Sequence, residues 1–114
     1  MNTLRKVAVV TGASQGIGAG LVQAFRDRGY RVVANSRSIK PSNDPDILTV
    51  AGDIADRAVA ERIVREGVAK FGRIDTLVNN AGVFTAKPFT AFTAEDYAAN
   101  IGVNLTGFFN ITQA

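Results

Sequence analysis

The stretch Thr11-Gly12-Ala13-Ser14-Gln15-Gly16-Ile17-Gly18 decides the fold of this chain. Residues 6–11, which lead into this stretch and share Thr11 with it, form a β-branched apolar run, which predicts a strand buried on both faces of a parallel sheet. After it, apolar residues recur at helical spacing from Ile17 to Arg28, and Gly29 stands where a C-terminal cap is expected. A glycine cluster between a strand and a helix is typical of a phosphate-binding turn.

Each glycine of this turn has a separate physical role. Gly12 permits the tight turn out of the strand, Gly16 lets the backbone approach a pyrophosphate, and Gly18 lets the helix pack close to the sheet. The start of the helix offers unpaired N–H groups and its positive dipole end to phosphates. A plain strand-to-helix turn is the alternative interpretation.

The rest of the chain continues the alternation of strands and helices. We expect strands at Arg31–Ala34, Ile47–Ala51 and Ile74–Val78, a loop around Pro41–Pro45, a helix from the N-cap Asp56 to a stop at Gly72, and a further helix starting at Thr93. Crossovers between parallel strands are right-handed. The pattern therefore predicts an α/β fold with a Rossmann-type doubly wound parallel sheet, three-layer α/β/α and incomplete within these residues.

The amino-acid composition excludes several classes of functional site and partner. The 114 residues are 46% apolar and 20% charged, which fits one globular domain. The absence of cysteine and histidine excludes thiolate chemistry, a Ser-His-Asp site and a His-ligated metal, so no metal site is expected. The net charge of +3 is scattered and forms no basic stripe, so no nucleic-acid partner is expected. The apolar run Val7–Val10 is too short for a signal peptide or a membrane span, and we expect a cytoplasmic protein without a membrane partner.

Four motifs in a fixed order resemble one known family. They are the Thr-Gly-x-x-x-Gly-x-Gly turn, Gly52-Asp53-Ile54, Asn79-Asn80-Ala81-Gly82 and Val103-Asn104-Leu105. The chain resembles the N-terminal portion of the short-chain dehydrogenases/reductases, and the matches run along its whole length. The resemblance implies an oxidoreductase that moves a hydride between a nicotinamide cofactor and a carbonyl or alcohol substrate.

The resemblance and the position of the motifs assign candidate site residues. Asp53 resembles the family's adenine-contacting acid, with a helix-approach cap as the alternative, and Asn104 resembles its active-site asparagine, with a polar residue tolerated in a helix as the alternative. The small residues from Asn80 to Gly82 leave room for a ribose and nicotinamide, unless they form only a turn. The expected cofactor-binding residues are Gly12, Ser14, Gln15, Gly16, Ile17, Gly18, Ser36, Arg37, Asp53, Ile54, Asn80, Ala81 and Gly82.

The end of the second strand indicates which nicotinamide is preferred. An acid that would hold the ribose 2′-OH of NAD is expected there, but the sequence reads Asn35-Ser36-Arg37. Arg37 can pair a 2′-phosphate bidentately, with Ser36 and Ser14 as further donors. We therefore expect NADP(H), with NAD(H) as the alternative, although Gln15 departs from the basic residue that some NADP enzymes of the family carry in the turn. A solvated loop charge is the other interpretation of Arg37.

The family's catalytic serine and Tyr-x-x-x-Lys are not found here. Tyr30 is followed four positions on by Ala34, and Tyr97 by Ile101. We expect residues 1–114 to be the N-terminal part of a single NAD(P)-binding domain whose catalytic part is absent, and to bind cofactor without catalysis. The full-length family member is expected to be a homo-oligomer. The fourth strand and the apolar side chains Leu105, Phe108, Phe109 and Ile111 are expected to have little covering them.

Two further readings of the sequence stay open. A non-catalytic NADP-binding module or redox sensor would use the same crevice without hydride transfer. A methyltransferase-like nucleotide fold would explain the glycine turn but not the stretch from Asn79 to Gly82.

Overall fold

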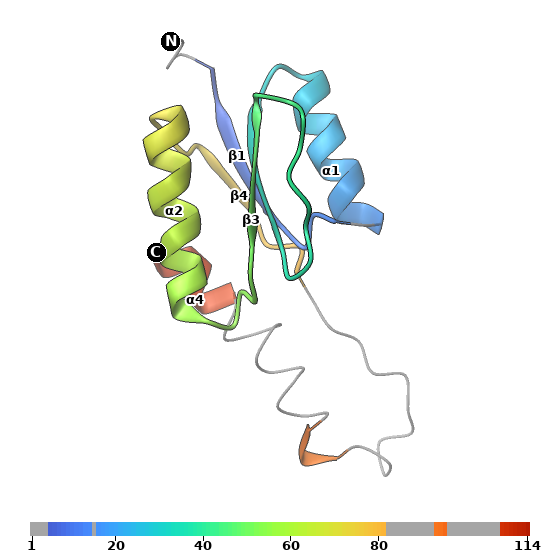
Figure 1. The fold of residues 1–114 in the computed structure, drawn as a ribbon, viewed down its shortest axis with the longest axis vertical. Coiled ribbons are helices and arrows are strands. Elements are labelled where there is room, and N and C mark those ends of the chain that lie inside the picture. Colours follow the sequence, from blue (N-terminus) through green and yellow to red (C-terminus); the bar gives the residue numbers. More distant parts are fainter. Residues whose placement is uncertain (1–4, 15, 82–92, 96–107) are drawn as a thin grey trace.

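A computed structural model of the chain describes residues 5–14, 16–81, 93–95 and 108–114. Within these residues the elements follow in the order β1 (Val7–Thr11), α1 (Gly16–Asp27), β2 (Arg31–Ser36), β3 (Ile47–Ala51), α2 (Arg57–Phe71), β4 (Thr76–Val78) and α4 (Phe108–Gln113). Figure 1 shows the strands side by side with helices packed against them. None of the helices in this described part is long and apolar enough to cross a membrane.

The described strands form one parallel sheet in the order β3-β2-β1-β4. The chain moves outward from β1 to β2 and β3, then returns through α2 to β4 on the other side of β1. The carboxyl ends of β1 and β4 therefore flank the point where the strand order reverses, which is where open α/β sheets bind ligands. The predicted doubly wound parallel sheet is confirmed.

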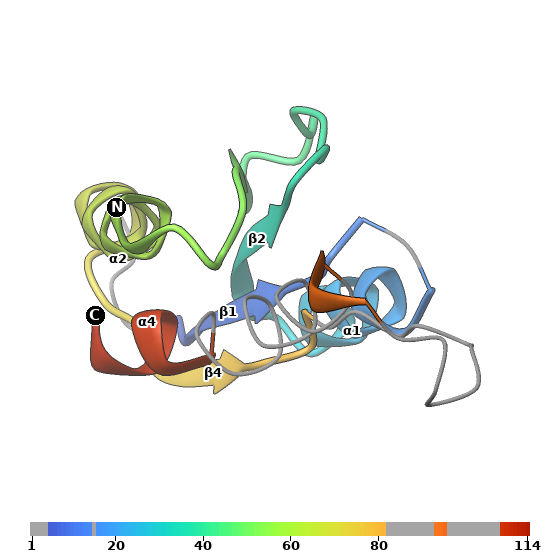
Figure 2. The same ribbon diagram turned by 90° about the horizontal axis from the view of Figure 1, so that it is seen from below.

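The core lies in two layers, one on each face of the sheet. Val7 and Val9 of β1 belong to a buried cluster with Ile63 of α2, whereas Val10 belongs to a second cluster against which Val22 of α1 packs. Figure 2 shows α2 and α4 on one side of the sheet and α1 on the other. All five residues of β1 are buried, as the sequence predicts for a central parallel strand.

The ends of α2 are capped as the sequence predicts. The Asp56 side chain accepts a hydrogen bond from the Ala58 N–H at 2.9 Å, which satisfies one of the free donors of the first turn. Gly72 adopts a left-handed conformation with φ of 84°, and its N–H donates to the Val68 carbonyl at 2.8 Å. Gly29, also left-handed with φ of 83°, lies two residues beyond the end of α1, and its N–H donates to the Arg26 carbonyl at 3.0 Å.

Three expectations differ from the structure. β2 continues two residues further than predicted, to Ser36, and β4 begins at Thr76 rather than at residue 74. The expectation that Ile111 has little to cover it was wrong, because Ile111 is only 4% exposed and lies in the cluster with Val9 and Ile63. Of the helix expected from Thr93, residues 94–95 are helical, while 96–107, with Leu105, and the side chains of residues 108–110 lie outside the description.

Candidate nucleotide site at the carboxyl edge of the sheet

The turn from β1 to α1 requires glycine at Gly12 for two reasons. Gly12 and Gly16 have φ of 64° and 58°, in the left-handed region that side chains disfavour. A Cβ on Gly12 would also lie 2.9 Å from the Cα of Ala81. The backbone of the glycine turn is therefore pressed against the loop that follows β4.

Gly18 brings α1 against the same turn. A Cβ at Gly18 would lie 1.8 Å from the carbonyl oxygen of Gly12 and 2.7 Å from Nδ2 of Asn80, distances at which the backbone would have to move. Gly18 is buried, whereas Ile17 beside it is 76% exposed at the start of the helix. The first turn of α1 thus sits on the backbone at the carboxyl edge, with its amide groups directed to that edge.

Hydrogen bonds lock the two loops of this edge together. The buried Thr11 hydroxyl accepts from the backbone N–H groups of Asn80 and Ala81, each at 3.0 Å, and donates to the Val78 carbonyl at 3.4 Å. The Asn80 amide donates to the Gly12 carbonyl at 3.1 Å. These contacts hold the ends of β1 and β4 in a fixed relation at the point where the strand order reverses.

Asn35 provides the same connection on the other side of β1. Its buried side-chain amide donates to the carbonyls of Val50 at 2.9 Å and Gly52 at 3.2 Å. Its own backbone carbonyl accepts from the Ala13 N–H at 2.9 Å. One side chain and its backbone therefore join the ends of β1, β2 and β3.

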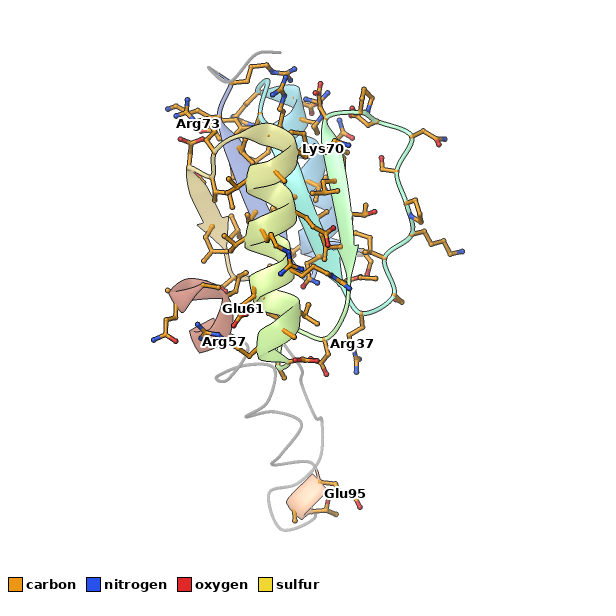
Figure 3. All side chains as sticks on the ribbon, turned by 60° about the vertical axis from the view of Figure 1, so that its left-hand side comes forward. Arg37, Arg57, Glu61, Lys70, Arg73 and Glu95 are labelled. Atoms are coloured by element: carbon orange, nitrogen blue, oxygen red, sulfur yellow. The ribbon has the colours of Figure 1, made fainter. Side chains whose placement is uncertain are left out.

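Ser36 and Arg37 lie at the carboxyl end of β2, where the chain leaves the sheet. The Ser36 hydroxyl is buried and has no hydrogen-bond partner among the described residues, although such groups are normally paired. Arg37 is exposed, and Figure 3 shows it at the same end of the sheet as Arg57, opposite Lys70 and Arg73. An unpaired hydroxyl and an exposed guanidinium at one strand end offer donors to an anionic ligand.

Asp53 and Ile54 lie where β3 leads into α2. The Asp53 carboxylate is exposed and accepts from the Ala55 N–H at 2.9 Å, while its carbonyl accepts from the Asp56 N–H at 2.9 Å. The Ile54 side chain is 4% exposed and packs in the core below α2. Asp53 therefore makes the local turn and still exposes its carboxylate, whereas Ile54 can offer a ligand only its backbone.

A pocket of about 500 Å³ adjoins this edge beneath the connection between β2 and β3. Ser14, which is exposed, and Ser38 contribute to its walls, and Ala34 and Ile47 contribute apolar surface. The pocket lies on the α1 side of the sheet, since Val22 also lines it. The pocket reaches from Ala13 and Ser14 of the glycine turn to residues 38–42 of the connection.

The sequence model of the short chain dehydrogenase family matches residues 6–114. The chain belongs to the short-chain dehydrogenase family. It is 37% identical over 121 residues to a 3-oxoacyl-(acyl-carrier-protein) reductase of Thermotoga maritima, a match that covers 95% of this chain and 48% of that protein. It is 35% identical over 113 residues to galactitol 2-dehydrogenase of Agrobacterium fabrum, covering 94% of this chain and 44% of that protein.

Solved structures of short-chain dehydrogenases have the same arrangement of elements. The crystal structure of 3-ketoacyl-(acyl-carrier-protein) reductase from Brucella melitensis complexed with NADH superimposes with a TM-score of 0.89 at 32% identity, covering 95% of this chain and 47% of that chain. The chain therefore spans about half the length of the curated relatives it matches, 48% and 44% for the two named above.

Most of the predicted site residues of this short-chain dehydrogenase chain come together at the carboxyl edge. The glycine turn, the end of β2 and the loop after β4 are joined there by the hydrogen bonds described above. Gln15, Gly82 and Asn104 lie outside the described residues. The prediction that they belong to the site stays a prediction.

Sequence reasoning missed two residues that organise the site. Thr11 was treated as the end of a strand and the first residue of the glycine turn, and Asn35 only as the place of a missing carboxylate, yet both are buried and bridge separate loops. A usable signal existed in each case, because a polar residue inside an otherwise apolar buried strand must find a partner. The identity of the partners depends on the sheet order.

Proposed function

We propose that this chain is the nucleotide-binding part of an NADP(H)-dependent short-chain dehydrogenase/reductase, acting on a small-molecule carbonyl or alcohol. One observation carries the proposal: the β1–α1 turn offers bare backbone at the switch point of the sheet. A Cβ on Gly12 or Gly18 would run into neighbouring backbone, so the turn is packed tightly against the sheet, while nothing lies within 4 Å of the Cβ position at Gly16. A turn of this kind leaves space for a pyrophosphate against the amides of a helix N-terminus.

The residues present fit a dinucleotide along the carboxyl edge. We assign the pyrophosphate to Gly12, Gly16 and Gly18 with the first amides of α1, and the adenine to Asp53 with the backbone of Ile54. We assign the nicotinamide and its ribose to the space beside Ile17, Asn80, Ala81 and Gly82. The bound nicotinamide would supply the hydride chemistry, while these residues position it and exclude water.

The preference for NADP(H) rests on the chemistry at the end of β2. Asn35, which stands near the expected position of a ribose-binding acid, uses its amide to bind the Val50 and Gly52 carbonyls. The described residues contain no ion-pair partner for Arg37, so its guanidinium is available to a 2′-phosphate. Ser36 and Ser14 add hydroxyl donors, and Gln15 completes the proposed turn.

We propose that this chain alone binds cofactor without turnover. The 114 residues contain no Tyr-x-x-x-Lys, and Asn104 is the one residue that we assign to the catalytic set. A tyrosine general acid needs a neighbouring ammonium to lower its pKa, and neither tyrosine here has a lysine four positions on. The proposed domain assignment is the N-terminal part of one NAD(P)-binding domain, in a cytoplasmic protein that is a homo-oligomer at full length.

The cofactor preference is tested by the substitution Arg37→Glu in the protein expressed from its complete reading frame. The NADPH dissociation constant should rise by roughly tenfold to a hundredfold, because a bidentate charge pair is replaced by repulsion. The NADH constant should change by less than about threefold. The control is Arg65→Glu, which makes the same charge change on an exposed part of α2. Equal losses for both cofactors in a fluorescence titration would contradict the assignment.

A non-catalytic NADP-binding module or redox sensor, which would use the same edge of the sheet without hydride transfer, is the second candidate. NADPH oxidation with a panel of carbonyl compounds separates the two candidates when the complete reading frame is assayed beside this 114-residue chain. Turnover by the former alone supports the enzyme. Binding without turnover by both supports the module, and turnover by the 114-residue chain would contradict the proposal that it binds cofactor without catalysis.

A further inference from the structure

The connection from β2 to β3 is short for a parallel crossover. Residues 37–46 run from the carboxyl end of β2 back to the amino end of β3, and none of them is helical, whereas such crossovers usually contain a helix. Figure 1 shows this connection as a single loop beside α1 and the sheet. Ten residues reach at most about 35 Å, and the return along a five-residue strand uses about half of that length. The two ends of the connection therefore cannot move independently over a large distance.

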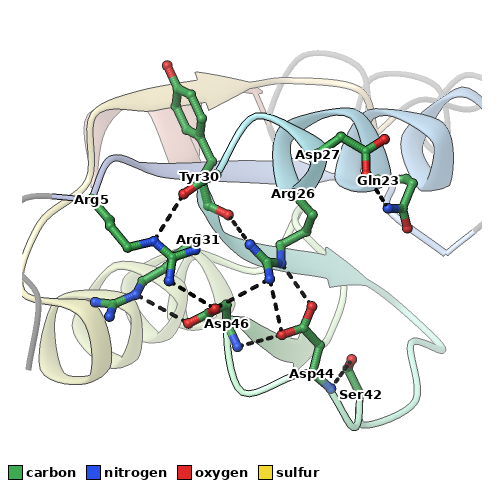
Figure 4. Close-up of polar contacts among 10 residues, drawn as sticks. Arg5, Gln23, Arg26, Asp27, Tyr30, Arg31, Ser42, Asp44 and Asp46 are labelled. Carbon is green, nitrogen blue, oxygen red and sulfur yellow. Dashed lines mark hydrogen bonds and ion pairs between the residues drawn. The ribbon is translucent and has the colours of Figure 1, made fainter.

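A charged cluster holds the far end of this connection. We call it the amino-edge cluster and define it as Arg5, Arg26, Arg31, Asp44 and Asp46. The Asp46 carboxylate pairs with Arg5 at 3.0 Å, with Arg26 at 3.3 Å and with Arg31 at 3.3 Å. Arg26 also pairs with Asp44 at 2.8 Å. Figure 4 shows these side chains converging from the start of β1, the end of α1 and the start of β2.

The cluster has the properties of a fixed anchor rather than of loose surface pairs. Its side chains are 13–33% exposed, and one carboxylate is shared by arginines from three elements. The Asp44 carboxylate also accepts the Asp46 N–H at 2.9 Å, and the Ser42 hydroxyl accepts the Asp44 N–H at 3.1 Å. The Arg26 guanidinium holds the pKa of the Asp44 carboxyl below its usual range.

The middle of the connection, residues 38–42, is supported by less packing than its ends. Ile39 packs on the α1-side core, but the pocket of about 500 Å³ lies beneath residues 38–42. A segment with few buried contacts opens more easily than the core, so its position depends strongly on the contacts at its ends. One end is the cluster, and the other carries Arg37.

We propose that Asp44 and Asp46, held by Arg26, are positioning residues for cofactor specificity: they fix the far end of the connection and so place Arg37 for a 2′-phosphate. This inference rests on the proposed NADP(H) preference. None of the cluster residues touches the carboxyl edge directly, so their effect should appear in discrimination between cofactors rather than in binding of the part that both cofactors share.

The test is the double variant D44N/D46N in the protein expressed from its complete reading frame. It removes the anchoring charges but keeps every arginine and the Arg26 contact to the Tyr30 carbonyl. The ratio of NADH to NADPH dissociation constants should fall by roughly two- to tenfold, with the NADH constant changed by less than about twofold. Hydrogen exchange of the amides at 38–43 should become faster.

Two controls make the result specific. E61Q/E66Q makes the same charge change and removes two ion pairs on α2, so it should leave the cofactor ratio unaltered. In an Arg37→Glu background, D44N/D46N should have no further effect on the ratio, because the residue it positions is gone. If the double variant does not fold, the single variant Asp44→Asn is measured in the same way.

The outcomes are distinguishable. If the wild type does not prefer NADPH, the proposed cofactor assignment fails and this inference fails with it. If the wild type prefers NADPH and loses that preference with Arg37→Glu but keeps it with D44N/D46N, the inference alone is overturned. Equal losses of both cofactors in D44N/D46N would show a merely structural role and would also overturn it.

Discussion

At the carboxyl edge of the sheet, Thr11 and Asn80 join two loops through neutral hydrogen bonds, whereas at the amino edge Asp46 pairs with arginines from the start of β1, from α1 and from the start of β2. The carboxyl edge is built from small residues in backbone contact, and it leaves Arg37 exposed. The amino edge pairs its charges with one another. The two edges therefore differ in what they leave unpaired: the carboxyl edge has the Ser36 hydroxyl without a partner among the described residues and Arg37 exposed, whereas the amino edge uses ion pairs to hold the starts of the strands and the β2–β3 connection.

The largest effect should come from filling the backbone contact at the carboxyl edge. Gly18→Ala places a methyl group against the Gly12 carbonyl and should lower the free energy of unfolding by about 3 kcal/mol or more, since the clash involves backbone that cannot move aside cheaply. Chemical denaturation measures the change. The matched control is Gly20→Ala on the same helix, where no atom lies within 4 Å of the added group and stability should rise by about 0.5–1 kcal/mol. Equal effects of the two substitutions would contradict the close packing.

The next largest effect is expected at the Asn35 side chain, which joins β2 to the end of β3. Asn35→Ala leaves the carbonyls of Val50 and Gly52 without their side-chain donor and should cost about 2 kcal/mol, because buried polar groups lose their partner. NADPH affinity should also fall, since Ser36 and Arg37 follow directly. The comparison is Asn43→Ala in the exposed loop, which should change stability by less than about 0.5 kcal/mol. An Asn35 variant as stable as the wild type would show that the bridge is unimportant.

The smallest effect concerns a charge at the amino edge. Asp75 pairs with Arg73 and accepts the Val7 N–H at 2.9 Å, and these contacts hold the pKa of its carboxyl below the usual range. A lowered pKa contributes stability that is present above the unfolded value of about 4 and is lost as the pH falls through the folded pKa. Asp75→Asn should therefore reduce stability slightly at neutral pH and make the decline below about pH 4 shallower. Unfolding curves from pH 7 to pH 3 measure this, and an unchanged acid slope would contradict it.

Local patterns were enough to predict much of this fold. The buried β1, both caps of α2 and the glycine turn are each encoded within a few neighbouring residues, so periodicity and capping chemistry identify them. The contacts of Asn35 and Thr11 could not be derived in this way. They cross to residues 15 and 70 positions away, and their partners are known only when the strand order is known.

The charged cluster shows the same limit of local reasoning. Arg5, Arg26 and Asp46 belong to separate segments, and the sequence alone shows them as scattered charges. The sheet brings the starts of its strands to one edge, and only then do they meet. Ile111 was mispredicted for a related reason, because its cover is provided by β1 and α2 rather than by its neighbours in the chain.

We propose that the carboxyl edge of the sheet binds a dinucleotide. Hydrogen–deuterium exchange of the protein from its complete reading frame, with and without saturating NADPH, tests it most directly. We expect NADPH to slow exchange chiefly in the glycine turn at 12–18, at the end of β2 at 36–37 and after β4 at 80–82. No change at saturating NADPH, or slowing confined to the amino edge around Arg5 and Asp46, would contradict it.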